Sequence, residues 1–217
     1  MARPPLIHFP GALFHVTARG NNKQIIFHSD KDFSRYLQNI QKCKKQIPFF
    51  LYAFALMPNH IHLLIEVAKA PISKIMQKLQ TAYTMYMNKK YDRVGHIFQG
   101  RYFSLLVEKE THLLELIRYI HLNPARAGIA PELGDYRWTS HGVYLDTDQK
   151  RANIVNTEKV LPYFSSDPKK ALANYQEFII AGLGKKWEDI AGDVKRGQIL
   201  GSSKFVQQVE RKLPKLG

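Results

Sequence analysis

Residues 49–67, FFLYAFALMPNHIHLLIEV, decide how we interpret this chain. Two apolar runs, each of strand length, flank Pro58 and Asn59, a dipeptide typical of a tight turn. The runs contain the aromatic and branched side chains that favour strands. We therefore predict an antiparallel hairpin with strands at 49–57 and 60–67.

The segments on either side of this hairpin alternate between strand and helix patterns. The predicted elements are a strand over 13–19, a helix from Ser29 or Asp30 to Pro48, the hairpin, a helix from Pro71 to about Tyr91, a strand over 101–107, and a helix from Thr111 to Pro124. This order, β-α-β-β-α-β followed by a helix, predicts an α+β fold of the ferredoxin-like, split β-α-β type. We expect one antiparallel sheet with helices on one face.

We expect two parts along the chain. Residues 1–145 would form the main domain, and residues 146–217 a linker over about 146–156 followed by a small basic extension. Amphipathic patterns over 170–183 and 203–213 predict that this extension is helical.

Composition excludes several classes of protein. Of 217 residues, 45% are hydrophobic, too many for a disordered chain. Apolar runs stop well short of the roughly 18 residues that span a bilayer, and the N-terminal residues show no apolar signal core. The single cysteine, Cys43, cannot form an intrachain disulfide. We expect a cytoplasmic protein that does not enter membranes.

The charge points to a class of partner. There are 32 Lys and Arg residues against 18 Asp and Glu, a formal net charge of +14. A folded domain with this surplus attracts polyanions, so nucleic acid is the first expectation and an anionic membrane surface the second.

His60 and His62 are candidates for metal binding. Side chains alternate along a strand, so these two imidazoles project on one side of the sheet and could converge on one ion. Histidine pairs of this kind are often incidental, and a metal would need a third ligand from elsewhere in the fold.

The helix that follows the last predicted strand offers such a ligand. At ~100° per residue, Tyr119 and Asn123 lie about 40° apart on its surface, with His112 and Glu115 on the same side. Spacing alone favours a simpler alternative, in which Tyr119 packs on the sheet and Asn123 only ends the helix before Pro124.

Three motifs resemble one family: RGN at 19–21, MPNHIH at 57–62 and YIHLNPARAG at 119–128. Together, over roughly residues 10–143, they resemble the single-tyrosine HUH transposases, and most closely the REP-associated tyrosine transposases. The resemblance implies a metal-dependent endonuclease and strand transferase for single-stranded or hairpin DNA of palindromic repeats. It implies that Tyr119 is the nucleophile, forming a 5′-phosphotyrosine, and that the metal ligands are His60, His62 and Asn123.

The resemblance has further implications for cofactor and assembly. The ion would be Mg²⁺ or Mn²⁺, although this ligand set would also allow Zn²⁺. A monomer is favoured over a homodimer, and the protein would be associated with the bacterial nucleoid.

Several other residues near these motifs could contribute. Candidates for DNA contacts are Arg19, Asn21, Asn22, Lys23, Arg101 and Arg126. Glu66, on the same strand face as His62, could support the metal site or simply meet solvent. Tyr102 is a rival nucleophile for which packing is the simpler role, and His121 is expected at the surface. The aromatic stripe of Tyr83, Tyr86, Met87 and Tyr91 favours core packing over base stacking.

Two other functions fit parts of the sequence. A domesticated relative could bind hairpin DNA without cutting it, although both histidines, the tyrosine and Asn123 are all present. A zinc hydrolase of small substrates would explain the histidine pair but would leave the +14 charge without a use.

Overall fold

A computed structural model describes residues 8–130, 132–184, 194–195 and 199–212. Its sheet has the strand order β2-β3-β1-β4-β6-β5. The strands are β1 (Leu13–Arg19), β2 (Phe49–Met57), β3 (His60–Val67), β4 (Phe103–Val107), β5 (Val194–Lys195) and β6 (Ile199–Leu200). Neighbours among the first four are antiparallel, with β1 and β3 in the middle. The predicted α+β fold with a split β-α-β sheet is confirmed.

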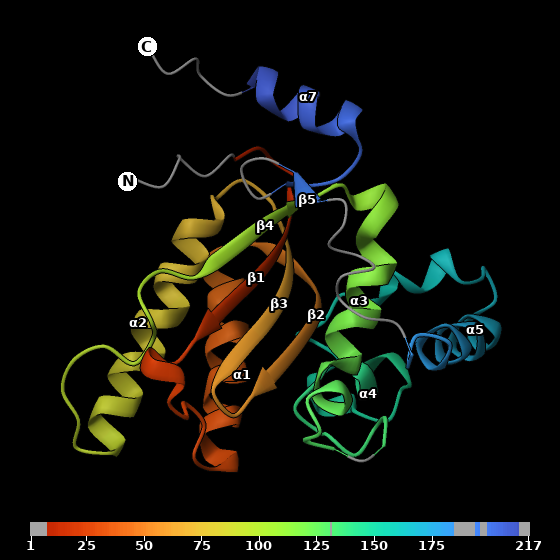
Figure 1. The fold of residues 1–217 in the computed structure, drawn as a ribbon. Helices are drawn as coiled ribbons and strands as arrows, with labels where there is room; N and C mark the ends of the chain where they lie inside the picture. The colour runs from red at the N-terminus through yellow and green to blue at the C-terminus, as the bar shows by residue number, and fades with distance from the viewer. Residues whose placement is uncertain (1–7, 131, 185–193, 196–198, 213–217) are drawn as a thin grey trace.

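Helices cover both faces of this sheet. They are α1 (Asp30–Gln46), α2 (Ile72–Lys90), α3 (Lys109–Arg126), α4 (His141–Tyr144), α5 (Pro168–Ile180) and α7 (Ser203–Lys212). Every residue of β3 from Ile61 to Ile65 is buried, so the side chains on both faces of that strand are covered. In Figure 1, α1 and α2 lie together behind the sheet. The Tyr119 ring of α3 instead contacts histidine rings on the other face, so the expectation of helices on one face holds for α1 and α2 but not for α3.

Helix α3 is longer than predicted at both ends. It begins at Lys109 rather than Thr111 and continues through Pro124 to Arg126. Its end comes at Ala127, whose N–H donates to the Asn123 carbonyl, and Gly128 follows with a φ of +66°. Proline lacks an N–H, but its fixed φ is helical, so the last turn continues without that one hydrogen bond. Asn123 is therefore inside the helix, one turn after Tyr119.

The C-terminal part of the chain is more closely integrated than expected. Ile154 and Val155, in the stretch expected to be a linker, are buried in the core. The Asn156 side-chain oxygen accepts hydrogen bonds from the Leu51 N–H of β2 at 3.1 Å and from the Lys44 ammonium at 2.8 Å. The extension is not purely helical either, because β6 pairs in parallel with β4.

A buried polar network joins α3 to the C-terminal part and corrects the expected position of His121. His121 is 2% exposed, with Nε2 2.6 Å from the Ser140 hydroxyl and Nδ1 2.8 Å from the Tyr175 hydroxyl. The same hydroxyl lies 2.6 Å from His141 Nδ1. Burial lowers the pKa of His141 to about 4, so this imidazole is neutral at neutral pH. His121 is not at the surface because α5 and the α4 region cover its side of α3.

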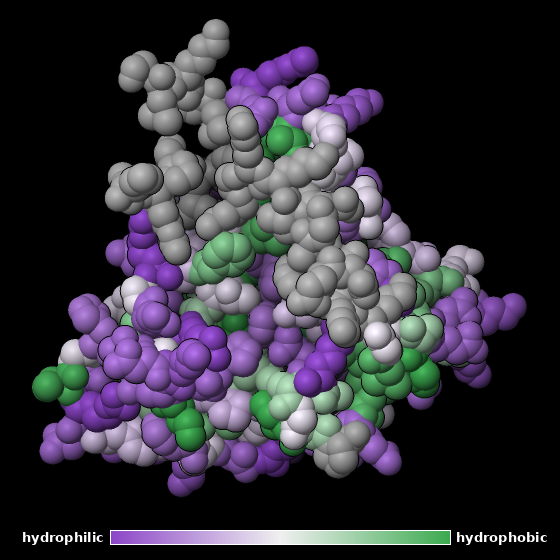
Figure 2. All heavy atoms as spheres, viewed as in Figure 1, coloured by the Kyte–Doolittle hydropathy of each residue, from purple (hydrophilic) through white to green (hydrophobic). Residues whose placement is uncertain are grey.

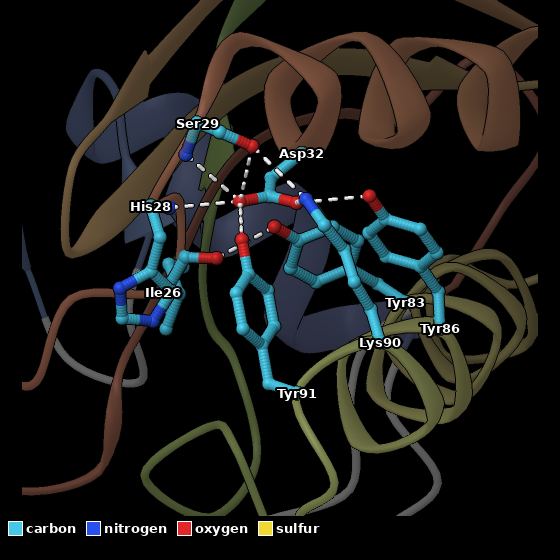
Figure 3. Close-up of polar contacts among 8 residues, drawn as sticks. All are labelled: Ile26, His28, Ser29, Asp32, Tyr83, Tyr86, Lys90 and Tyr91. Carbon is cyan, nitrogen blue, oxygen red and sulfur yellow. Dashed lines mark hydrogen bonds and ion pairs between the residues drawn. The ribbon is translucent and has the colours of Figure 1, made fainter.

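A buried carboxylate fixes the loop after β1 to the end of α2 (Figure 3). Asp32, at the third position of α1, is fully buried. It forms a capping box with Ser29, the residue before the helix, in which the Asp32 side chain accepts from the Ser29 backbone N–H. Its donors are the backbone N–H groups of His28 and Ser29, both at 2.9 Å, the hydroxyls of Tyr91 and Tyr86 at 2.7 and 2.9 Å, and the Lys90 ammonium at 2.5 Å. The predicted aromatic stripe on α2 is thus confirmed as packing: Tyr83 and Met87 are buried, while Tyr86 and Tyr91 bind Asp32.

Burial alone would raise the pKa of the Asp32 carboxyl. The hydrogen bonds from Lys90, Tyr91, Tyr86 and Ser29 outweigh burial and hold this pKa well below its usual value. The carboxylate therefore stays charged in the folded protein at any pH that the native state normally meets.

Among the described residues, none of the helices is both long enough and apolar enough to pass through a bilayer.

Replacing Asp32 with Asn should lower the free energy of unfolding by about 1.5–3 kcal/mol at pH 7, because the buried carboxylate would no longer accept charge-assisted hydrogen bonds from Lys90 and the two tyrosines. The pKa of Asp32 is depressed on folding, so its contribution is complete above the unfolded value of about 3.9 and declines as the pH falls below it. Urea unfolding at several pH values measures this. The control Tyr86→Phe removes one donor and should cost about 1 kcal/mol at most pH values. An equal stability difference between wild type and Asp32→Asn at pH 7 and pH 3 would contradict the assignment.

Ending the chain at Asp146 should abolish cooperative unfolding. The truncation removes Tyr175 and Ile179 from the core, and losing each such side chain typically costs about 2–5 kcal/mol. A chain that ends at Gly184 keeps both residues and is the control, which we expect to melt cooperatively. Thermal melting followed by circular dichroism compares the two, and a chain ending at Asp146 that melts like wild type would refute the prediction.

Candidate functional site

His60 and His62 open β3 directly after the turn at Pro58 and Asn59. As predicted from strand alternation, the two imidazoles lie together, with ring centroids 5.0 Å apart. His62 is buried, with 6% of its surface exposed, and His60 is half-buried at the sheet end. The pair therefore has one ring inside the fold and one ring nearer to solvent.

Helix α3 brings Tyr119 to the same face of the sheet. The Tyr119 ring meets the His62 ring edge-on, with centroids 5.9 Å apart, and meets the His15 ring in the same way at 5.9 Å. The Arg126 guanidinium lies 5.6 Å from the centroid of the Tyr119 ring. Asn123 follows one helical turn after Tyr119 and is half-buried. The convergence of the tyrosine and the histidine pair is thus a feature of the fold.

The histidines are neutral and held in place by their Nδ1 atoms. Burial and then the charge of Arg19 lower the pKa of His60 to about 4. Burial, followed by the nearby His15 and His60, lowers the pKa of His62 well below its usual value. His60 Nδ1 donates to Asn59 Oδ1 at 2.6 Å, because a carbonyl oxygen can only accept, and this leaves Nε2 of His60 with its lone pair.

This donor set fits a divalent cation only when an amide is included. Within the described ranges, no group of three or more His, Cys, Asp or Glu side chains is arranged to hold a metal ion. Two neutral imidazoles suit such a cation, and an amide oxygen such as that of Asn123, on α3, would be a harder third donor. Three protein ligands would leave coordination positions open to a phosphate oxygen.

The loop that follows β1 lies beside the histidine turn. Arg19 pairs with His60 in the sheet, the Gly20 N–H donates to the Asn59 carbonyl at 2.8 Å, and the Asn21 N–H donates to the Ile97 carbonyl at 2.8 Å. Gly20 permits a close approach, since a Cβ there would lie 2.2 Å from the Gln24 carbonyl oxygen. Residues 19–23 and 97–101 therefore form one surface next to His60, which we call the loop surface.

Most of the predicted DNA contacts lie on this loop surface. Exposed there are Arg19, Asn21, Asn22, Lys23 and Arg101. In Figure 2, the corresponding lower left part of the molecule is mainly hydrophilic. Arg126 is placed differently, because it is half-buried over the Tyr119 ring and donates to the Gly182 carbonyl at 3.0 Å.

Two other candidates have different surroundings. Glu66 accepts from Lys109 at 2.5 Å and from the Tyr52 hydroxyl at 2.8 Å, and Leu64 lies between it and His62 on that strand face. Glu66 therefore binds Lys109 and Tyr52 and not His62, the residue that it was expected to support. Burial raises the pKa of Tyr102 to about 12, and its hydroxyl is buried with no hydrogen-bond partner among the described residues, which favours packing over nucleophilic attack.

Residues 112 and 115 of α3 also have structural partners. His112 is buried, and Glu115 forms an ion pair with Arg118, whose guanidinium donates to the Phe178 carbonyl at 3.2 Å. His112 and Glu115 share one side of α3 with Tyr119. The first half of that side therefore makes structural contacts, and the second half carries the candidate site.

Sequence reasoning missed two residues that touch the histidine pair. Asn59 lies within the MPNHIH motif and binds His60, while His15 lies on β1 and binds His62 Nδ1 through its Nε2 at 3.0 Å. The position of Asn59 beside His60 was a usable signal. His15 is 47 residues from His62, so only the pairing of β1 with β3 identifies it as a neighbour.

Comparison with known proteins gives concordant matches. The family model described as "Transposase IS200 like" matches residues 9–123, more than half of the chain, and this range includes Tyr119, Asn123 and both histidines. A Haemophilus influenzae protein described as a REP-associated tyrosine transposase is 24% identical over 120 residues, which are 48% of this chain and 68% of that protein.

A solved structure of a REP-associated tyrosine transposase bound to a REP hairpin shares the fold. It matches with a TM-score of 0.57 and 17% identity, over 64% of this chain and 82% of that one. Because the family model covers more than half of the chain, the chain belongs to the family of IS200-like transposases.

Proposed function

We propose that this protein is an endonuclease and strand transferase for single-stranded DNA at hairpin repeats, acting through a covalent 5′-phosphotyrosine. The observation that carries the proposal is the edge contact between Tyr119 and His62, with ring centroids 5.9 Å apart on one face of the sheet. A tyrosine that only packed on the sheet would not need to adjoin a neutral histidine pair at the sheet end.

Tyr119 would supply the attacking oxygen. Its phenol oxygen forms a bond to the scissile phosphorus while the bond from phosphorus to the 3′-oxygen breaks. The phenol proton leaves to solvent, and the departing 3′-oxygen takes up a proton to become a 3′-hydroxyl. The phosphotyrosine keeps the energy of the phosphodiester, so a second 3′-hydroxyl can attack it and rejoin DNA without a nucleotide cofactor.

His60, His62 and Asn123 would hold a divalent cation, Mg²⁺ or Mn²⁺. When bound, such an ion polarises a non-bridging phosphate oxygen and stabilises charge on the leaving oxygen. The low pKa of His60, about 4, means that protons compete little for that imidazole at neutral pH. Arg126, 5.6 Å from the Tyr119 ring centroid, adds positive charge beside the nucleophile.

The loop surface would hold the DNA backbone next to Tyr119. It carries three exposed cationic side chains, Arg19, Lys23 and Arg101, beside the histidine turn. The related solved protein was captured with a REP hairpin, which supports a folded hairpin as the substrate of this chain as well. The net charge of +14 favours the same class of partner.

Tyr119→Phe should abolish covalent attachment to DNA while preserving binding. Wild type, incubated with Mn²⁺ and hairpin oligonucleotides from the repeats of the source genome, should give a protein–DNA adduct on denaturing electrophoresis. The variant should give none, because it lacks only the attacking oxygen, and EDTA should suppress the wild-type adduct.

Tyr102→Phe is the matched control for this experiment. It should form the adduct at the wild-type level, since its hydroxyl is buried away from solvent. An adduct that survives in Tyr119→Phe would refute the assigned nucleophile. Tight hairpin binding by wild type with no adduct under any metal would instead favour a non-catalytic hairpin-binding protein.

The double variant Lys23→Gln, Arg101→Gln should weaken hairpin binding and reduce its dependence on salt. Each lost phosphate contact should lower the slope of log K against log salt by about 0.7–0.9, so the pair should lower it by about 1.4–1.8. The control is Lys42→Gln, which removes an exposed charge near the C-terminal end of α1. It should leave the slope unchanged. Fluorescence anisotropy titrations at several salt concentrations measure both, and equal slopes for the double variant and wild type would place the DNA elsewhere.

A further inference from the structure

His15 contacts both the candidate ligand His62 and the candidate nucleophile Tyr119. It lies in the middle of β1, is 3% exposed, and stacks on His62 with ring centroids 5.3 Å apart and planes 16° apart. In the sheet, His15 stands opposite Leu64 and Thr17 stands opposite His62, so the two histidines are diagonal neighbours on one face. Diagonal neighbours are within reach of ring side chains.

One proton lies between His15 and His62, and its position decides what His62 can bind. The distance of 3.0 Å from His15 Nε2 to His62 Nδ1 is that of a hydrogen bond, so one nitrogen donates and the other accepts. If His15 donated, His62 would carry its own proton on Nε2 and could not offer that atom to a cation. If His15 accepts, the His62 proton is on Nδ1 and the Nε2 lone pair is available.

We infer that His15 is a positioning residue that accepts the Nδ1 proton of His62 and thereby presents the Nε2 lone pair of His62 to the metal. The inference rests on the proposed function, since it assumes that His62 is a ligand. It assigns to His15 a role in metal affinity and in the orientation of His62, without contact between His15 and the ion. Ligand histidines in metal sites commonly have their second nitrogen engaged in this way.

Two features of the site support this direction of the hydrogen bond. His60, the other candidate ligand, donates its Nδ1 proton to Asn59 Oδ1 at 2.6 Å, so the neighbouring ring already has the tautomer that leaves Nε2 open. Asn59 itself is oriented, because its amide nitrogen donates to the Lys23 carbonyl at 3.2 Å. The same tautomer on both rings would direct two lone pairs to one ion.

The test measures tautomers and Mn²⁺ affinity on the full chain without DNA. Two-bond ¹H–¹⁵N NMR spectra of the metal-free protein distinguish a proton on Nδ1 from one on Nε2, and we expect Nδ1 for His62 in wild type. His15→Phe keeps a ring in the stack but removes the acceptor. It should move the His62 proton to Nε2 and weaken Mn²⁺ binding by about 10- to 100-fold.

Two further variants separate this role from a loss of packing. His15→Gln supplies an amide oxygen that can accept, and should recover most of the Mn²⁺ affinity. Tyr175→Phe removes a buried hydroxyl from the network around His121, away from the site, and should lower stability without changing Mn²⁺ affinity.

A wild-type His62 with its proton on Nε2 would overturn the inference, as would a His15→Phe variant that binds Mn²⁺ like wild type. Wild type that binds no Mn²⁺ would overturn it together with the metal site. These results are distinct from a failure of the proposed reaction, which would show as Mn²⁺ binding and the expected tautomer with no adduct on DNA.

Discussion

The register between β1 and β3 is the constraint on which the site depends. It pairs Arg19 with His60 and Thr17 with His62, and it places His15 two pairs further along, opposite Leu64. Because side chains alternate, a slip of one residue would transfer the histidines to the face that α1 and α2 cover. The apolar residues of the opposite face, Ile61, Leu63 and Ile65, oppose such a slip, since it would remove them from the core. The apolar face of β3 thus determines where its polar face lies.

The position of α3 is determined from the side away from the histidines. His121 projects from α3 into the network with Ser140 and Tyr175, and the Ser140 hydroxyl also accepts from the Phe54 N–H of β2 at 2.9 Å. Unpaired polar groups in such a place are costly, so this network tolerates few positions of the helix. Tyr119, two residues before His121, is thereby oriented over the sheet. Through this network, Tyr175 in the C-terminal part of the chain contributes to the position of the candidate site.

The fold and the main site residues could be predicted from local patterns. Strand alternation and helix spacing put His60 with His62 and Tyr119 with Asn123, and the motifs joined the two pairs through a family resemblance. Some failures are local, such as the ends of α3, which continues through Pro124, but the larger ones involve contacts between distant residues. Helical geometry gives the side of α3 on which His121 lies, but not that α5 covers it. Ile154 and Val155 look isolated in a polar stretch, although they are buried in the core next to residues that bind β2.

The pairing of β6 with β4 has a consequence for biosynthesis. Strand β4 ends at Val107, and β6, which pairs with its last two residues, Leu106 and Val107, ends at Leu200. At a synthesis rate of about 5–20 residues per second, these 93 residues take roughly 5–20 s to be made after β4. During that interval the backbone donors and acceptors on this edge at Leu106 and Val107 are open to pairing with other chains. A nascent chain on a crowded polysome is therefore exposed to strand pairing with its neighbours at Leu106 and Val107, a hazard that is reduced when residues 199–200 join the sheet.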